Sequence, residues 1–230
     1  MQAVILCGGL GTRLLPVTSE TPKAMVSVLG KPFLEYEIAV LEDYGVKEVV
    51  LCTGHLSSVI ESFFEKDFDS KVKIKFSHEK KPLGTGGALR NARKFIKEDF
   101  LFLNGDTFIN IDYHDVFERF KALGVLSLMV VRKADSDVYS GNVDLSTEDF
   151  VLRYDGGAGL NFIDAGVSVF SKRIFDFFPE KQVFALEEEV YPQLARSRDL
   201  SAYLTSKPFF DIGTSQGLSV FKDYLEGGSL

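Results

Sequence analysis

The sequence contains few residues of the kinds that build disulfide frameworks or metal clusters. Its 230 residues include two cysteines and three histidines. Cys7 and Cys52 each end an apolar run (VILC and VVLC), so we expect two buried thiols and a reducing, cytoplasmic location. None of the histidines (His55, His78 and His114) has a partner at metal-ligand spacing, and we assign them no role.

Long basic blocks and long apolar runs are also missing. The net charge of −7 argues against nucleic acids or anionic membranes as main partners. No apolar run is long enough to span a membrane, and the first residues, MQAVI, lack the basic start of a signal peptide. An acidic protein that handles phosphates must therefore gather its cations locally or recruit a metal ion.

Hydrophobic residues are abundant, at 45%, and 21 of the residues are phenylalanine. A chain of this length and composition can bury the core of one large α/β domain. The phenylalanine-rich segment 174–184 has two interpretations. It is either part of this core or a contact surface of a homodimer.

The first half of the chain alternates between strand-like and helix-like segments. Buried strands are predicted at 2–7, 47–53, 72–76 and 100–104, and helices at 33–44, 55–65 and 87–97. This rhythm is typical of a mostly parallel sheet with helices on both faces. Ligands of such sheets bind at the carboxyl ends of the strands.

The second half has a different character. Strands are predicted at 125–131, 141–145, 150–154 and 163–170, and helices at 171–177, 185–196 and 214–225. Short polar turns join several of these strands, which suggests hairpins added to the sheet. No linker or repeat interrupts the chain, so we predict a single domain over residues 1–230.

The glycine-rich stretch GGLGTRL, residues 8–14, directly follows the first predicted strand. Glycine lets backbone N–H groups approach a ligand, and such amides together with Arg13 suit phosphate oxygens. A Walker A loop is excluded because the stretch lacks Gly-Lys-Ser/Thr. A dinucleotide fingerprint is excluded because its third glycine would fall at Leu14. The alternative is a strand-to-helix turn with a surface arginine.

Three further residues have the chemistry of a phosphate or metal site. Asp106 follows a buried strand in Asn-Gly-Asp, and Asp211 follows an apolar stretch in FFDIGT. Carboxylates at such places suit Mg²⁺, although a turn and a helix N-cap are the simpler interpretations. Lys23, after Pro22, is either a phosphate ligand or an ordinary surface lysine.

Two other motifs each have a functional and a structural interpretation. The stretch LGTGG, residues 83–87, precedes a predicted helix, which favours either anion binding or a loop cap. Asp67-Phe68-Asp69 has the Asp-x-Asp pattern of glycosyltransferases, but it lies in the charged stretch KDFDSK. We interpret it as a solvated loop.

The order of these pieces along nearly the whole chain resembles the sugar-1-phosphate nucleotidyltransferase family. It is most similar to guanylyltransferases acting on D-glycero-α-D-manno-heptose 1-phosphate or mannose 1-phosphate. The resemblance implies a Rossmann-like (GT-A-like) three-layer α/β domain with a mixed, mostly parallel sheet. It also implies a nucleotide-binding half, 1–112, and a hairpin-rich, sugar-phosphate-binding half, 113–230. The reaction would join an NTP, with GTP favoured, to a sugar 1-phosphate and release pyrophosphate.

The resemblance also assigns roles to individual residues. The catalytic residues would be Arg13, Lys23, Asp106 and Asp211, of which the two aspartates would hold Mg²⁺. The nucleotide would contact Leu6, Gly8, Gly9, Gly11, Thr12, Arg13, Lys23, Glu79, Gly84, Thr85, Asn104 and Asp106. The sugar phosphate would contact Gly141, Asp164, Gly166 and Glu187.

The sequence departs from the family pattern where the sugar phosphate should bind. Many relatives have Glu-Lys after the strand at 150–154, but this chain continues Asp155-Gly156-Gly157. Where relatives often carry Asn-Ala-Gly or Asn-Gly-Gly, this chain has Asp164-Ala165-Gly166. Arg153 is the one nearby cation that could replace the lysine.

These departures leave other functions open. The first is a uridylyl- or thymidylyltransferase acting on another sugar 1-phosphate, such as MurNAc 1-phosphate or glucose 1-phosphate. The second is a glycosyltransferase, which has no need for the GTR and PK motifs. The third is a non-catalytic regulatory subunit that binds a nucleotide sugar, against which the four catalytic candidates argue together.

Overall fold

The structure is a computed structural model that describes residues 1–9, 20–135, 140–155 and 159–228. Its strands are β1 (Gln2–Leu6), β2 (Ser27–Val28), β3 (Lys31–Pro32), β4 (Glu48–Thr53), β5 (Lys73–His78), β6 (Phe100–Asn104), β7 (Thr107–Ile109), β8 (Ser127–Lys133), β9 (Val143–Leu145), β10 (Val151–Tyr154), β11 (Phe162–Phe170), β12 (Leu200–Leu204) and β13 (Phe209–Asp211). Its α-helices are α1 (Phe33–Asp43), α2 (Ser57–Lys66), α3 (Gly84–Ala92), α4 (Tyr113–Leu123), α5 (Leu186–Glu189), α6 (Tyr191–Ser197) and α7 (Ser215–Glu226). Short 3₁₀ helices are η2 (Lys23–Met25), η3 (Arg93–Phe95) and η4 (Lys172–Phe177).

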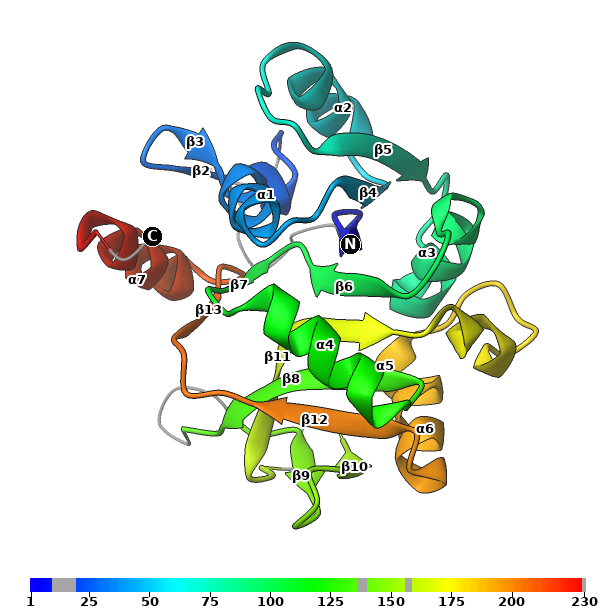
Figure 1. Ribbon diagram of the computed structural model, residues 1–230. Coiled ribbons are helices and arrows are strands. Elements are labelled where there is room, and N and C mark those ends of the chain that lie inside the picture. The colour runs from blue at the N-terminus through cyan, green and yellow to red at the C-terminus, as the bar shows by residue number, and fades with distance from the viewer. Residues whose placement is uncertain (10–19, 136–139, 156–158, 229–230) are drawn as a thin grey trace.

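One large mixed sheet organises the chain (Figure 1). Strand β1 lies between β4 and β6 and is parallel to both, and β5 continues the parallel part beyond β4. The direction then reverses, because β11 pairs antiparallel with β6 and with β8. Strand β12 completes that side parallel to β8, and β9 and β10 form the expected hairpin beyond β11. The predicted α/β class is therefore confirmed.

The sheet separates two hydrophobic cores, as the alternation along β1 shows. Ala3 and Ile5 point into one core, which is closed by α1, α2, α4 and α7. Val4 points into the other core, which α3, α6 and η4 cover. All three side chains are fully buried. Helices thus cover both faces, in a three-layer arrangement that places the strand ends at one open edge.

The ends of the helices follow from local chemistry. Helix α1 stops before Gly45, as predicted, where the backbone enters the left-handed region. Helix α4 was not predicted from the sequence, although Asp112 caps it by accepting from the Asp115 amide and Gly124 ends it. The segment 171–177, predicted as a helix, is the 3₁₀ helix η4.

Helix α3 begins three residues earlier than predicted, within the LGTGG stretch. Gly86 is buried because the segment around Phe184 packs directly against this turn of the helix. A Cβ at Gly86 would lie 2.1 Å from Phe184 Cε2. These glycines therefore serve close packing, which is a different role from the loop cap considered above. Phe175 and Phe184 are themselves buried, so this phenylalanine-rich segment contributes to the core.

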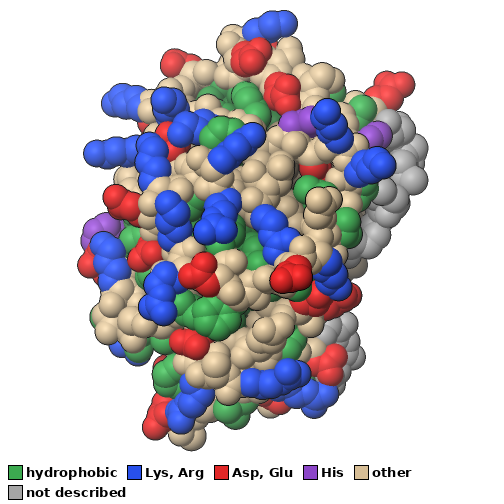
Figure 2. All heavy atoms as spheres, turned by 90° about the vertical axis from the view of Figure 1, so that its right-hand side faces the viewer, with side chains coloured by type: hydrophobic (Ala, Val, Ile, Leu, Met, Phe, Trp, Pro, Cys, Tyr) green, Lys and Arg blue, Asp and Glu red, His purple; other side chains and the backbone are tan. Residues whose placement is uncertain are grey.

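No helix among the described residues is both long and apolar enough to cross a membrane. The face of the molecule seen in Figure 2 carries many lysine and arginine side chains, with acidic side chains among them.

Helix α1 carries a buried acid on its inner face. Glu37 is only 4% exposed, and its Oε2 has no hydrogen-bond partner. Burial raises the pKa of Glu37 well above its ordinary value, and the negative charge of Asp106 raises it further. The carboxyl group therefore holds its proton at pH values where an exposed glutamate has lost it.

We expect Glu37→Gln to remove a pH-dependent loss of stability. In the wild type the folded pKa exceeds the unfolded pKa, so the folded state binds more protons between the two values. The free energy of unfolding then falls as pH rises through that window. A difference of one between the folded and the unfolded pKa changes the free energy of unfolding by about 1.4 kcal/mol. Urea unfolding from pH 4 to 9 should show the variant gaining stability relative to wild type as pH rises, whereas a constant difference would contradict the prediction.

Candidate active site

A cavity of about 350 Å³ opens at the carboxyl ends of β1 and β6. This is the edge at which α/β sheets bind ligands. Most of the predicted nucleotide-site residues that the structure describes meet here, as expected from the two strand-end motifs. The lining residues are Leu6, Cys7, Gly8, Gly9, Lys23, Ala24, Cys52, Glu79, Pro82, Gly84, Thr85, Ala88, Asn104, Gly105, Asp106 and Glu187.

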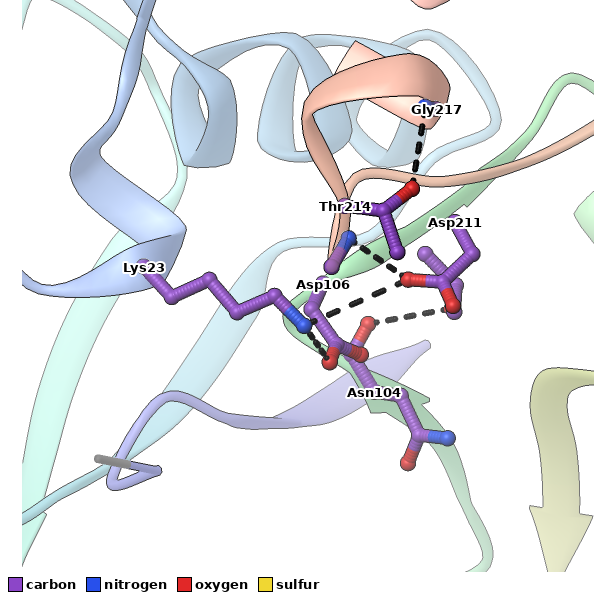
Figure 3. A network of polar contacts seen from close by, with 8 residues as sticks. Lys23, Asn104, Asp106, Asp211, Thr214 and Gly217 are labelled. Carbon is purple, nitrogen blue, oxygen red and sulfur yellow. Dashed lines mark hydrogen bonds and ion pairs between the residues drawn. The ribbon is translucent and has the colours of Figure 1, made fainter. Parts of the chain in front are cut away.

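Lys23 joins the two predicted metal ligands at the edge of this cavity (Figure 3). Its Nζ makes a short ion pair with Asp106 Oδ2 and lies 4.0 Å from Asp211 Oδ1. The lysine is only 9% exposed, so it is not an ordinary surface lysine. Figure 3 shows the Asn104 side chain directed away from this group. Residues 23, 106 and 211, which are far apart in the sequence, thus form one charged cluster.

A small two-stranded sheet brings Asp211 to Asp106. Strand β13 pairs antiparallel with β7, which places Asp211 opposite Thr107, and the Ile212 amide donates to the Asp106 carbonyl over 3.0 Å. The Asp211 carboxylate accepts from the Gly213 amide over 2.6 Å. The N-cap of α7 is Thr214, so the helix-cap interpretation of Asp211 is wrong.

The two carboxylates fit a divalent cation. One positive charge, Lys23 Nζ, already lies between them, which shows that both carboxylates face one position. Within the described ranges, no group of three or more His, Cys, Asp and Glu residues could hold a metal. Mg²⁺ suits such a place because it takes one or two carboxylates and completes its octahedron with water and phosphate oxygens.

Glu79 lines the same cavity as Asp106. Its Oε2 accepts from the Leu83 amide over 3.3 Å, and a Cβ at Gly8 would lie 3.1 Å from its Oε1. Burial raises the pKa of the Glu79 carboxyl. The carboxylate therefore lies beside the start of the glycine-rich loop. Three predicted ligands of that loop, Gly11, Thr12 and Arg13, lie outside the described residues.

Thr85 connects the predicted nucleotide side to the predicted sugar side. Its hydroxyl donates to Glu187 Oε2 over 2.5 Å and accepts from the Leu186 amide over 2.8 Å. Glu187 lines the cavity from α5, whereas Thr85 lies in the first turn of α3. This pair fixes the direction of the Glu187 carboxylate.

Asp164 lies in β11, close enough to Glu187 to be affected by its charge. Its Oδ1 accepts from the Gly166 amide over 2.8 Å, and its Oδ2 accepts from the Tyr154 hydroxyl over 3.2 Å. Burial, with the charge of Glu187 as a smaller cause, raises the pKa of Asp164 to about 7. This acid is therefore about half ionised at neutral pH.

Glu187 is the one predicted sugar-phosphate residue among the described cavity-lining residues, because Gly141, Asp164 and Gly166 do not line the cavity. Gly141 forms an isolated bridge with Leu160 and is not among the cavity-lining residues within the described chain. Arg153 is exposed and pairs with Asp155 over 2.7 Å. Gly156 and Gly157, where the sequence departs from the family pattern, lie outside the described residues.

The sequence analysis did not anticipate the apolar part of the cavity wall. Cys7, Cys52, Ala24 and Ala88 all line it, and they come from four different parts of the chain. Small apolar residues carry no chemical motif. The only available signal was that both cysteines end strands whose carboxyl ends face the cavity.

A profile of the nucleotidyl transferase family matches residues 2–226. The chain belongs to this family. Members of the family generally need a divalent metal ion.

Individual relatives agree with this assignment. D-glycero-alpha-D-manno-heptose 1-phosphate guanylyltransferase from Campylobacter jejuni is 37% identical over 222 residues, which cover 94% of this chain and 96% of the relative. Mannose-1-phosphate guanyltransferase beta-A from Xenopus laevis is 32% identical over 99% of this chain but only 63% of its own length. The crystal structure of HddC from Yersinia pseudotuberculosis complexed with GMP-PN is 32% identical and superimposes with a TM-score of 0.84, covering 97% and 99% of the two chains.

Proposed function

We propose that this nucleotidyl transferase transfers a guanylyl group from GTP to heptose 1-phosphate or mannose 1-phosphate. The observation that carries the proposal is the cluster of Lys23, Asp106 and Asp211 at the strand-end cavity. The relatives described above support the choice of substrates, because their names specify these sugars and guanylyl transfer.

The proposed reaction is an in-line displacement at the α-phosphorus. An oxygen of the sugar phosphate forms a bond to this phosphorus while the bond to the bridging oxygen breaks. The electron pair leaves with pyrophosphate. A sugar phosphate is largely dianionic at neutral pH, because its second pKa is near 6, as for phosphorylated side chains. It needs no general base, and positioning and charge neutralisation carry the catalysis.

Each part of the site has a role in this reaction. Lys23 neutralises charge at the α-phosphate, while Arg13 and the loop amides hold the triphosphate. Asp106 and Asp211 would hold Mg²⁺, which supplies positive charge to the reacting phosphates when it is bound. Residues 1–112 hold the nucleotide and residues 113–230 the sugar phosphate. Asp211 belongs to the second half, and the pairing of β13 with β7 returns it to Asp106.

The direct experiment measures pyrophosphate release when GTP, UTP, dTTP, CTP or ATP is combined with each member of a panel of sugar 1-phosphates. The panel should contain D-glycero-α-D-manno-heptose, mannose, glucose and MurNAc 1-phosphates. GTP with the heptose or mannose compound should give the highest kcat/KM. Preference for UTP or dTTP would contradict the guanylyl proposal, and no release from any pair would contradict catalysis itself.

Glu79 supplies a specific prediction about the base. Guanine presents two adjacent donors, N1–H and the N2 amino group, and one carboxylate can accept both. The Glu79→Gln variant opposes one of them with an N–H donor, so GTP selectivity should fall by about 1–3 kcal/mol, as for a bidentate base contact. The measurement is kcat/KM for GTP, UTP, dTTP, CTP and ATP in both proteins. An unchanged preference for GTP would show that other groups read the base.

Asp164 predicts a pH dependence on the sugar side. Its pKa of about 7 means that its negative charge, which opposes an anionic substrate, appears between pH 6 and 8. The KM for the sugar 1-phosphate should therefore rise several-fold over this range in the wild type. In Asp164→Asn this rise should disappear, because the amide does not become negatively charged over this range. If the KM for the sugar 1-phosphate changed with pH in the same way in both proteins, Asp164 would have no role in sugar-phosphate binding.

A further inference from the structure

A second cavity, separate from the candidate active site, lies on the outer side of helix α3. It is open to solvent and has a volume of about 870 Å³. Its lining residues are Leu83, Gly87, Arg90, Asn91, Arg93, Lys94, Lys172 and Gln182, none of which lines the first cavity. Among these described residues are four cations and no acid. This is a notable concentration of positive charge in a chain of net charge −7.

None of these four cations forms an ion pair with a carboxylate within the described part of the chain. Lys172 is nevertheless held in place, because its Nζ donates to the Lys97 carbonyl over 3.1 Å. The Arg93 guanidinium lies over the Phe175 ring at 5.1 Å. Asp99 Oδ1 accepts from the Lys172 backbone amide over 3.0 Å, but this carboxylate forms no ion pair with the Lys172 ammonium.

Arg90 forms the rigid side of this cavity. Its guanidinium donates to the carbonyls of Pro179 and Lys181 and lies 4.6 Å from the centre of the Phe184 ring. Carbonyl groups orient the arginine without cancelling its charge.

Two explanations of this charge can be compared. Cations near the end of α3 oppose the negative end of its helix dipole, which stabilises the helix modestly. That explanation accounts for Arg93 and Lys94. It does not account for Lys172, which comes from η4, nor for a hollow between the two elements.

We propose that this basic cavity binds a small molecule carrying two or more phosphate groups. Arginine and lysine from separate elements suit several phosphate oxygens, arginine as a fork and lysine as a point charge. The volume exceeds what a single phosphate needs and falls in the range of sites for small-molecule ligands. Such a ligand would contact Arg90, on the helix α3 that also carries Thr85 of the first cavity. It would also contact Gln182, in the segment that leads into α5 and its Glu187.

The test is NMR titration of the wild-type protein with inorganic tripolyphosphate in the presence of EDTA. Backbone amides of Asn91, Arg93, Lys94 and Gln182 report the basic cavity, and the amides of Gly8 and Gly9 report the candidate active site separately. We expect both sets to shift. In Arg93→Gln/Lys94→Gln, affinity at the basic cavity should fall about tenfold or more, while binding at the glycine loop persists.

Two further variants complete the test, the first as a matched control and the second as an independent change within the basic cavity. Lys71→Gln/Lys73→Gln removes the same charge from exposed residues elsewhere and should leave both affinities unchanged. Lys172→Gln weakens binding from η4 without altering the end of α3. All three variants should retain wild-type melting temperatures to within a few degrees and wild-type pyrophosphate release.

Several results would overturn the proposal. One is the absence of any shift at the basic cavity. Another is equal tripolyphosphate affinity in Arg93→Gln/Lys94→Gln and Lys71→Gln/Lys73→Gln. A separate sedimentation assay with vesicles of phosphatidylglycerol and phosphatidylcholine tests lipid headgroups as the ligand. Vesicle binding that depends on Arg93 and Lys94, without tripolyphosphate binding, would assign the cavity to lipid headgroups instead.

Discussion

Asp106→Asn and Asp211→Asn should each lower kcat by about 100- to 1,000-fold, the range seen when one preorganised electrostatic contact is lost. The amide keeps the shape of the side chain but removes the negative charge that would hold Mg²⁺. Both carboxylates face Lys23 Nζ, so they act on one position. The double variant should therefore be hardly worse than either single variant, because residues acting through one ion are strongly non-additive.

Steady-state pyrophosphate release over a range of Mg²⁺ concentrations measures this effect. Asp112→Asn, at the exposed N-cap of α4, is a matched control and should keep full activity. Circular dichroism should show that all the proteins are folded. Near-wild-type turnover of either site variant at low Mg²⁺ would reduce that aspartate to a turn residue. Additive losses would show that the two carboxylates act independently.

The sequence predicted the architecture well where hydrophobic periodicity is strong. The strand at 100–104 has the predicted bounds, and β1 and β4 differ from the predictions by one residue at one end. Helix α4 was missed because its charged face obscures the apolar positions Val116, Phe117 and Phe120. Strand β12 also escaped, since it is short and its pairing with β8 is a long-range contact.

The residues of the candidate site were predicted individually, but a single sequence does not show which of them are in contact. Strand-end position suggested that Gly8 and Asp106 share a crevice, and both line the cavity. The contact of Lys23 with both aspartates depends on the pairing of β13 with β7, for which the sequence has no local signal. The glycines of LGTGG are ambiguous in a different way. A glycine-rich stretch can form either a ligand-binding loop or a site of close packing, and only the position of Phe184 shows that these glycines allow close packing.

Lys23→Ala should lower kcat by about 100-fold or more while changing the KM for GTP only slightly. Charge on the α-phosphate oxygens is redistributed most in the transition state. A preorganised cation there contributes more to the transition state than to substrate binding. The burial of Lys23 supports this argument, because a cation removed from water interacts more strongly with a bound phosphate. A raised KM with unchanged kcat would assign Lys23 to uniform phosphate binding instead.

The dependence of activity on Mg²⁺ distinguishes a catalytic role of Lys23 from a merely structural one. In the wild-type structure the Lys23 ammonium lies between Asp106 and Asp211, where Mg²⁺ would have to compete with it. Lys23→Ala should therefore lower the Mg²⁺ concentration needed for half-maximal residual activity, even as kcat falls. Lys31→Ala, at an exposed lysine that pairs with Glu35, is the control and should change neither quantity. If Lys23 only supported the fold, Lys23→Ala would lose thermal stability. Its Mg²⁺ requirement would stay the same or rise, because the carboxylates of Asp106 and Asp211 would no longer be held toward one position.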